Sequence, residues 1–162
     1  MANQSRGSDP VRLNLIVAPP VTFGIPFGAG VALHVMTGGE IETGNNIIAV
    51  GFGIVLVAVG LFLAGWTTIA LRRAGEHPHP SRATATLVTD GPFRFSRNPI
   101  YLGFVSLAMG IGLALNSYWV LGSVSVAFIA LQVLVVTREE RYLETVIGHE
   151  YAEYRERVRR WL

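Results

Sequence analysis

The chain of 162 residues contains no cysteine, and only 15% of its residues are charged. The absence of cysteine excludes disulfides, thiolate metal sites and cysteine nucleophiles. All 13 basic residues are arginine, so Schiff-base chemistry and a lysine general base are excluded as well. Soluble domains carry about 25% charged residues, and 51% of this chain is hydrophobic. We therefore expect a small integral membrane protein with a single membrane domain over residues 1–162.

Four apolar stretches approach the roughly 20 residues that a helix needs to cross a bilayer. The sequence predicts membrane helices over residues 13–36, 47–71, 100–115 and 118–136, of which the third is short. Asn116 and Ser117 predict a tight turn, so the third and fourth spans should form a helical hairpin. The expected fold is all-α, with a polar N-terminus over 1–12, no cleaved signal peptide, and a C-terminal amphipathic helix.

Small residues recur at helical spacing in two of these spans. Gly24 and Gly28 form a GxxxG pair, and Ser106, Gly110 and Ala114 form a row of small residues four positions apart. Such rows let membrane helices approach closely. Both are therefore predicted to lie at helix–helix contacts.

Arginine distribution sets the expected topology. A pI near 9.4 would suit a nucleic-acid-binding protein, but the arginines gather in residues 72–99 and 137–162, whereas residues 37–46 hold two glutamates and no arginine. By the positive-inside rule, both termini and the 72–99 loop are predicted to be cytoplasmic. We expect a bacterial plasma-membrane protein with no nucleic-acid partner.

The 72–99 loop is long enough to carry a function. His77 and His79 are each followed by proline, which enforces an extended backbone, and no carboxylate cluster is nearby, so a solvated turn is favoured over a metal site. Arg97 and Asn98 come immediately before the third span. The arginine could anchor lipid headgroups, and the asparagine could cap the helix that follows.

The fourth span ends in Arg138-Glu139-Glu140-Arg141. Adjacent helical residues point about 100° apart, so one glutamate should face a site while the other pairs with an arginine. The alternative is a solvated helix start. Further along, an apolar face is predicted from the spacing of Ile147, Tyr151, Tyr154, Val158 and Trp161. The opposite face carries Arg155, Arg157, Arg159 and Arg160, as on a helix that lies on anionic lipid.

These motifs resemble a known superfamily. Residues 87–103, LVTDGPFRFSRNPIYLG, and then Glu139-Glu140-Arg141-Tyr142-Leu143, Tyr151-x-x-Tyr154 and Val158-x-x-Trp161 are similar to signatures of the isoprenylcysteine carboxyl methyltransferase and phospholipid methyltransferase superfamily. The resemblance covers roughly residues 60–162. It departs where several relatives carry histidine in place of Asn98, and in the small number of spans.

The resemblance implies a membrane methyltransferase that uses S-adenosylmethionine, held in a cytoplasm-facing pocket under a C-terminal lid, with a lipophilic substrate entering from the bilayer. The catalytic residues it implies are Arg97, Asn98 and Glu140. The cofactor-binding residues it implies are Val88, Thr89, Gly91, Arg97, Asn98, Tyr101, Glu139, Glu140, Arg141, Tyr151 and Tyr154. The acceptor could be a carboxylate, an amine or a thiol.

The chemistry of the residues agrees with this implication. S-adenosylmethionine carries a carboxylate that suits arginine and an ammonium that suits glutamate. Two alternatives stay open: a membrane reductase of the sterol-reductase type that uses NADPH, and a non-enzymatic membrane scaffold. The methyltransferase hypothesis requires that Arg97 and the two glutamates, which lie at opposite ends of the predicted hairpin in sequence, meet in one pocket.

Overall fold

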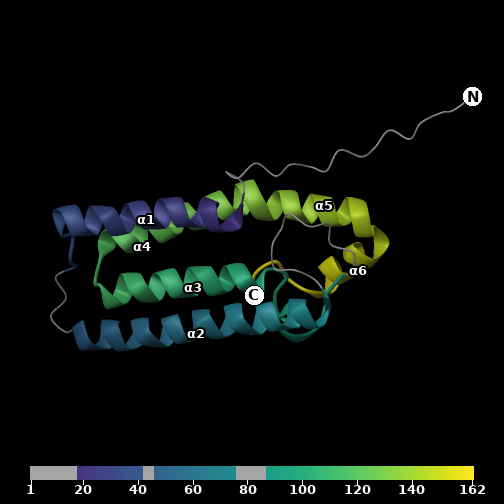
Figure 1. The fold of residues 1–162 in the computed structure, drawn as a ribbon, viewed down its shortest axis with the longest axis horizontal. Helices are drawn as coiled ribbons and strands as arrows, with labels where there is room; N and C mark the ends of the chain where they lie inside the picture. Colours follow the sequence, from purple (N-terminus) through teal and green to yellow (C-terminus); the bar gives the residue numbers. More distant parts are fainter. Residues whose placement is uncertain (1–17, 42–45, 76–86) are drawn as a thin grey trace, which may run out of the picture.

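The computed structural model describes residues 18–41, 46–75 and 87–162 (Figure 1). Residues 13–17 of the first predicted span, and His77 and His79, lie outside them. In the described ranges the chain forms helices only, as predicted. These are α1 (Pro19–Thr37), α2 (Asn46–Arg73), the 3-10 turn η2 (Gly91–Arg94), α3 (Pro99–Ala114), α4 (Tyr118–Leu131), the π-helical turn η3 (Gln132–Val136), α5 (Thr137–Ile147) and α6 (His149–Arg157).

The long helices lie side by side along one axis (Figure 1). Helix α2 packs against α3, α3 against α4, and α4 against α1. Helix α5 continues α4 beyond the bundle, and α6 then turns back toward the start of α3. We call the end with η2, α5 and α6 the site end. The far end holds the α1–α2 and α3–α4 connections.

Within the described residues, three helical stretches are long and apolar enough to cross a membrane, so the chain is an integral membrane protein. They are α1, α2 and a continuous helix from Tyr118 to Ile147, whereas α3 has only 16 residues. The prediction of four membrane spans, the third of them short, is therefore not confirmed. The fourth predicted span, 118–136, lies within the longest of these helices, which runs through η3 until Gly148, whose φ of 67° breaks it.

The contact between α2 and α3 is built on small residues. A Cβ added at Gly110 would lie 2.6 Å from the carbonyl oxygen of Gly53, and one added at Gly53 would lie 2.9 Å from the backbone nitrogen of Ala114. The Ser106 hydroxyl donates a hydrogen bond to the Leu56 carbonyl oxygen across the same interface (3.0 Å). The predicted role of the Ser106-Gly110-Ala114 row in helix packing is confirmed.

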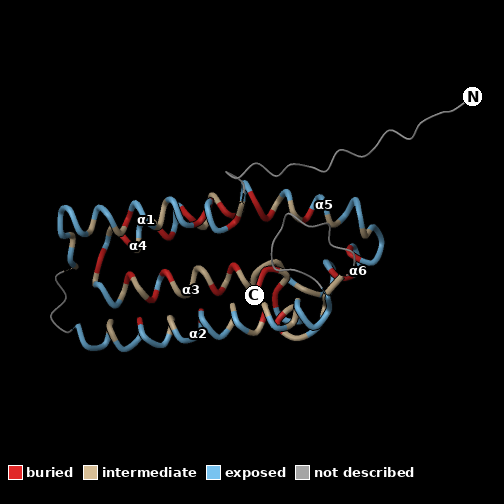
Figure 2. Tube along the Cα trace, viewed as in Figure 1, coloured by how far each residue is buried: buried red, intermediate tan, exposed pale blue. Residues whose placement is uncertain are grey.

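The GxxxG pair behaves differently. No atom of another described helix lies within 4 Å of a Cβ added at Gly24 or Gly28, so the prediction that this pair forms a helix contact is wrong for the described chain. Helix α1 packs on α4 through another face. Gly30 lies against Ser123, and Phe23 joins the buried core between the helices. Figure 2 shows that buried residues follow the inward faces of α3 and α4, whereas α2 is largely exposed, as expected for helices surrounded by lipid.

The turn between α3 and α4 forms as predicted. Asn116 adopts a positive φ of 50°, a conformation that asparagine tolerates better than most residues. Ser117 is the N-cap of α4, and its hydroxyl accepts a hydrogen bond from the Val120 backbone nitrogen (3.2 Å). The two helices therefore run antiparallel (Figure 1).

The C-terminal helix is shorter than predicted. Helix α6 ends at Arg157, and Val158 is extended (φ −121°, ψ 128°), so a helix reaching Trp161 is wrong. We call residues 158–162 the C-terminal strap. Its backbone pairs with the loop ahead of α3, because the Arg97 backbone nitrogen donates to the Arg159 carbonyl oxygen (3.0 Å). This pairing replaces the helical hydrogen bonds that the strap would otherwise make.

Candidate functional site

The loop ahead of α3 is shaped by its own short side chains. Gly91 starts η2 with a φ of 62°, which favours glycine. The Ser96 hydroxyl accepts a hydrogen bond from the Asn98 backbone nitrogen (3.1 Å) and donates one to the Arg160 carbonyl oxygen (3.0 Å). Asn98 occupies the N-cap position of α3, but its side chain makes no capping hydrogen bond. Its amide donates instead to the Arg160 carbonyl oxygen (3.2 Å).

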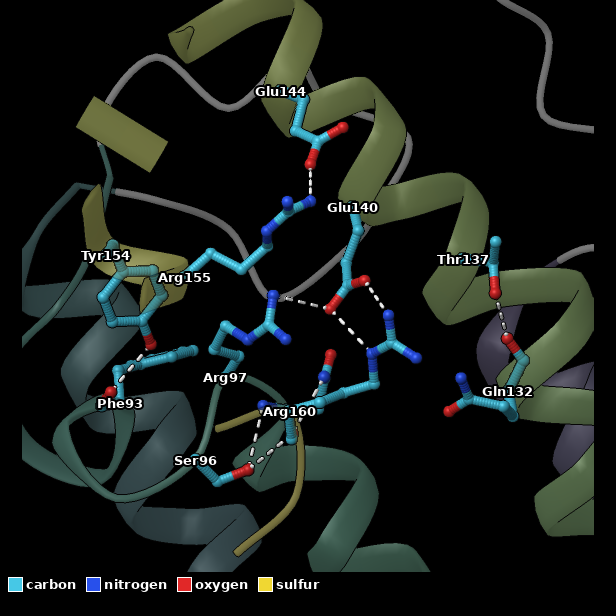
Figure 3. Close-up of polar contacts among 11 residues, drawn as sticks. Phe93, Ser96, Arg97, Gln132, Thr137, Glu140, Glu144, Tyr154, Arg155 and Arg160 are labelled. Carbon is cyan, nitrogen blue, oxygen red and sulfur yellow. Dashed lines mark hydrogen bonds and ion pairs between the residues drawn. The ribbon is translucent and has the colours of Figure 1, made fainter. Parts of the chain in front are cut away.

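Arg97 projects from this loop toward α5 and meets Glu140 there (Figure 3). The Arg97 Nη1 and Glu140 Oε1 atoms are 3.0 Å apart, and each side chain is only 10% exposed. Glu140 also binds Arg160 of the strap, with 3.0 Å to Nε and 2.6 Å to Nη2. One carboxylate therefore lies between two guanidinium groups, which come from separate parts of the chain.

The Arg97 guanidinium is incompletely bonded. Its Nε atom is buried and has no acceptor among the described residues, and the Nη1 contact with Glu140 is close enough for an ion pair but lacks hydrogen-bond geometry. A buried donor without an acceptor costs about 1–3 kcal/mol, and more when it is charged. Such a group calls for a specific explanation. It fits an anion that binds in this cluster.

Glu139 lies beside Glu140 on α5 but has a different partner. The buried Tyr101 hydroxyl of α3 donates a hydrogen bond to Glu139 Oε2 (2.9 Å). The two glutamates thus divide between an arginine pair and a tyrosine. Arg97 precedes the α3–α4 hairpin in sequence and the two glutamates follow it, and all three lie in one cluster at the site end.

Two tyrosines of α6 cover this cluster. Tyr151 and Tyr154 are both buried, with ring centroids 6.2 Å apart. The Tyr154 hydroxyl donates to the Phe93 carbonyl oxygen (2.7 Å), and the Tyr151 hydroxyl interacts with the Arg97 guanidinium. Burial raises the pKa of both hydroxyls, with Glu140 adding to the rise at Tyr151. Both phenols therefore stay neutral near pH 7.

The remaining predicted residues lie apart from the charged cluster. Val88 and Gly91 line a cleft of about 330 Å³ together with the end of α2. The lining residues are Trp66, Ile69, Ala70, Arg73, Ala74, Val88, Asp90 and Gly91. Thr89 is partly buried between them, and Arg141 is exposed on α5.

Two residues of the cluster were not predicted as part of a site. Ser96 could have been recognised, because a hydroxyl two positions before an asparagine commonly accepts that residue's backbone N–H. Arg160 was assigned to a lipid-facing surface, yet it binds Glu140, and this hydrogen bond raises the pKa of its guanidinium. No local pattern predicts this contact, because Glu140 lies on α5 and Arg160 lies 20 positions further on in the non-helical strap.

Comparison with known proteins supports the interpretation of these motifs. A protein-S-isoprenylcysteine O-methyltransferase B of Arabidopsis thaliana is 28% identical over 116 residues, covering 66% of this chain and 55% of the relative. The protein-S-isoprenylcysteine O-methyltransferase of Schizosaccharomyces pombe is 33% identical over 72 residues, covering 44% and 30%. A cobalt-zinc-cadmium resistance protein of Cupriavidus metallidurans is 33% identical over 77 residues, covering 48% and 35%.

The chain thus spans about half or less of the length of these relatives. No solved structure matches it significantly. Residues 48–150, from the start of α2 to the start of α6, match the sequence model of the phospholipid methyltransferases. This range contains the α3–α4 hairpin with Arg97 at one end and both glutamates at the other. The chain belongs to the phospholipid methyltransferase family.

Proposed function

We propose that the protein transfers a methyl group from S-adenosylmethionine to a lipophilic acceptor at the cytoplasmic face of the membrane. The observation that supports this most strongly is the buried Arg97 guanidinium, whose Nε atom has no acceptor among the described residues. It joins the loop ahead of α3 to the start of α5, and both segments lie within residues 48–150, which match the family.

The residues of the cluster fit the cofactor's amino-acid group. Arg97 would bind its carboxylate, because a guanidinium presents paired donors that match carboxylate geometry. Glu139, which has one oxygen bonded by Tyr101, would hold the ammonium or the ribose hydroxyls. Glu140 would orient Arg97 rather than contact the cofactor, since both of its carboxylate oxygens already bind arginines.

When bound, S-adenosylmethionine would supply an electrophilic methyl group carried on a sulfonium. The contribution of the protein is to orient the reactants and exclude water. Arg97 lies in the loop ahead of α3 and Glu139 on α5, which continues α4, so the tight α3–α4 hairpin returns both to the same end of the bundle. Holding two reactants in a productive geometry can supply about 7–11 kcal/mol. Tyr151 and Tyr154 would cover the site and keep it dry.

The acceptor would be a carboxylate, an amine or a thiol on a lipophilic molecule. A carboxylate or thiolate can attack without further proton transfer, whereas an amine needs a proton acceptor. Glu139 is the glutamate of the pair that is not held by arginines, so it would take that proton. Two of the relatives are named for isoprenylcysteine as their substrate, which supports an acceptor attached to an apolar chain.

The site end would face the cytoplasm of a bacterium. Arg72 and Arg73 form the last turn of α2 at this end. Arg97 lies in the loop ahead of α3, and Arg138 and Arg141 lie on α5, at the same end. The described far end carries Glu40 and no arginine. Basic residues on one side of the membrane mark the cytoplasmic side.

Binding of S-adenosylmethionine to the purified protein in detergent tests this proposal. The wild type is expected to bind the cofactor, and Arg97→Ala is expected to lose binding by at least about tenfold, because a charged hydrogen-bonded pair contributes about 1.5–3 kcal/mol. Arg138→Ala is the matched control, since Arg138 is exposed on the same helix as Glu140. NADPH serves as the competing ligand.

The methyl acceptor would then be found by incubating membranes with isotopically labelled S-adenosylmethionine and identifying the labelled lipid or small molecule. Wild-type affinity in Arg97→Ala would remove the assignment of this residue. Binding of NADPH in place of S-adenosylmethionine would replace the proposed reaction with a reduction.

A further inference from the structure

Arg160 reaches the cluster from outside the residues that match the family model. The family match ends at residue 150, and Arg160 lies ten positions further on, in the C-terminal strap. Its guanidinium nevertheless makes the best-formed contact of Glu140, with Nε 3.0 Å from Oε1 and Nη2 2.6 Å from Oε2. This side-on arrangement is the bidentate pairing that arginine forms with carboxylates.

The two arginines do not share Glu140 equally. Arg160 takes both carboxylate oxygens, whereas Arg97 approaches only Oε1, at 3.0 Å and without hydrogen-bond geometry. One negative charge therefore faces two positive charges, and the surplus lies on Arg97. The surplus is concentrated at a side chain that is nine-tenths buried and whose Nε atom has no acceptor among the described residues.

We propose that Arg160 is a positioning residue that holds Glu140 in this bidentate pair and thereby keeps the Nε edge of Arg97 free to bind an anionic group. The identification of that anion as the cofactor's carboxylate rests on the proposed function. The unpaired Nε atom of Arg97 is observed independently of it. Without Arg160, the Glu140 carboxylate, already 3.0 Å from Arg97, would turn to pair side-on with Arg97. The anion site would then be neutralised by the protein's own carboxylate.

The strap can hold Arg160 in place without help from its guanidinium. The Arg160 carbonyl oxygen accepts hydrogen bonds from the Ser96 hydroxyl and the Asn98 amide. The neighbouring Trp161 ring packs against Phe128 of α4, with centroids 4.9 Å apart. These contacts use the backbone and the next residue, so we expect the strap to stay docked in Arg160→Gln. The substitution should therefore change charge pairing rather than folding.

The first measurement is independent of any cofactor. In protein with 15N-labelled arginine in detergent, the Arg97 Nε–H resonance is assigned by its loss in Arg97→Lys. We expect it to move downfield in Arg160→Gln, because Glu140 then accepts its hydrogen. In Arg160→Gln with Glu140→Gln it should return toward the wild-type position, because a neutral amide competes weakly for the guanidinium.

The second measurement is the affinity for S-adenosylmethionine in the same variants. Arg160→Gln is expected to weaken binding about 10- to 100-fold, the range expected when a charge-assisted pair is lost. The double variant is expected to recover most of this affinity. A strap with a purely structural role would give a double variant that binds no better than Arg160→Gln. If Arg160→Gln does not fold, Arg160→Lys replaces it, since lysine keeps the charge but cannot pair side-on.

An unchanged Arg97 resonance in Arg160→Gln, or a double variant without recovery in that resonance, overturns the positioning role. If the resonance responds to the substitutions as expected but not to S-adenosylmethionine, the positioning role stands and the proposed function falls. If it responds to both, the two proposals hold together.

Discussion

The two ends of the helix bundle use polar groups in opposite ways. At the far end, the Trp119 indole nitrogen donates to the Thr37 hydroxyl (2.9 Å), and the Tyr118 backbone nitrogen donates to the Gly39 carbonyl oxygen (3.2 Å). These groups are neutral and satisfy one another. At the site end, by contrast, Arg97, Glu140 and Arg160 are charged, and Arg97 is left with a buried donor that has no acceptor in the described chain.

This difference indicates what each end is for. Hydrogen bonds at the far end close the connections between helices, and the buried polar atom without a partner in the described chain there is the neutral Nδ1 of His34. Buried charge is weak evidence for stability, since its desolvation cost can exceed the gain from pairing. Natural sequences depart from local satisfaction mainly at functional sites. An unpaired charged donor costs more than an unpaired neutral one, so the unsatisfied arginine supports our proposal that the ligand binds at the site end.

The largest effect should come from disrupting the close contact between helices α2 and α3. A Cβ added at Gly60 of α2 would lie 2.7 Å from the Gly103 carbonyl oxygen of α3. Gly60→Leu should force these helices apart, at a cost of about 3 kcal/mol or more. Thermal unfolding in detergent, followed by circular dichroism, measures the loss. Cofactor binding should fall with it.

Gly65→Leu is the matched control for that substitution. Gly65 lies on the same helix, is exposed, and has no atom within 4 Å of an added Cβ. It should keep both stability and binding. Equal losses in the two variants would mean that leucine harms α2 through helix propensity or detergent contacts rather than through its packing on α3.

A smaller and local effect is expected at the site end from Tyr101→Phe. The substitution removes the hydroxyl that donates to Glu139 (2.9 Å) and keeps the aromatic ring. The buried carboxylate loses its donor and its orientation, so the affinity for S-adenosylmethionine should fall about tenfold. Calorimetric titration measures this change. Unchanged affinity would show that Glu139 does not face the ligand.

Much of this architecture could be predicted from the sequence, because it depends on short-range patterns. The Asn116-Ser117 turn and the close packing of Gly110 both follow from the properties of single residues. The contact between Arg97 and Glu140 could be predicted by one further inference from the helical hairpin. A hairpin returns its two ends to the same side of the membrane.

The features that were missed depend on contacts between distant segments. The π-helical turn η3, where the Thr137 hydroxyl donates to the Gln132 carbonyl oxygen (2.8 Å), is not revealed by apolar periodicity. The strap is extended rather than helical, and its carbonyl oxygens accept hydrogen bonds from Ser96, Arg97 and Asn98. Helical spacing of Tyr154, Val158 and Trp161 predicted the opposite.

The smallest effect should come from the far end, and it sharpens the comparison most. Trp119→Phe removes the indole donor to Thr37 and keeps an aromatic ring, and the contact is exposed. Hydrogen bonds contribute about 0.5–1.5 kcal/mol, and an exposed one should lie at the low end, so the midpoint of thermal unfolding should fall slightly. The affinity for S-adenosylmethionine should not change, because the far and site ends share no polar partner in the described chain and separated sites act additively. A loss of affinity comparable to that of Tyr101→Phe would mean that α4 transmits the state of the far end to Glu139, and the two ends would then have to be treated as one coupled unit.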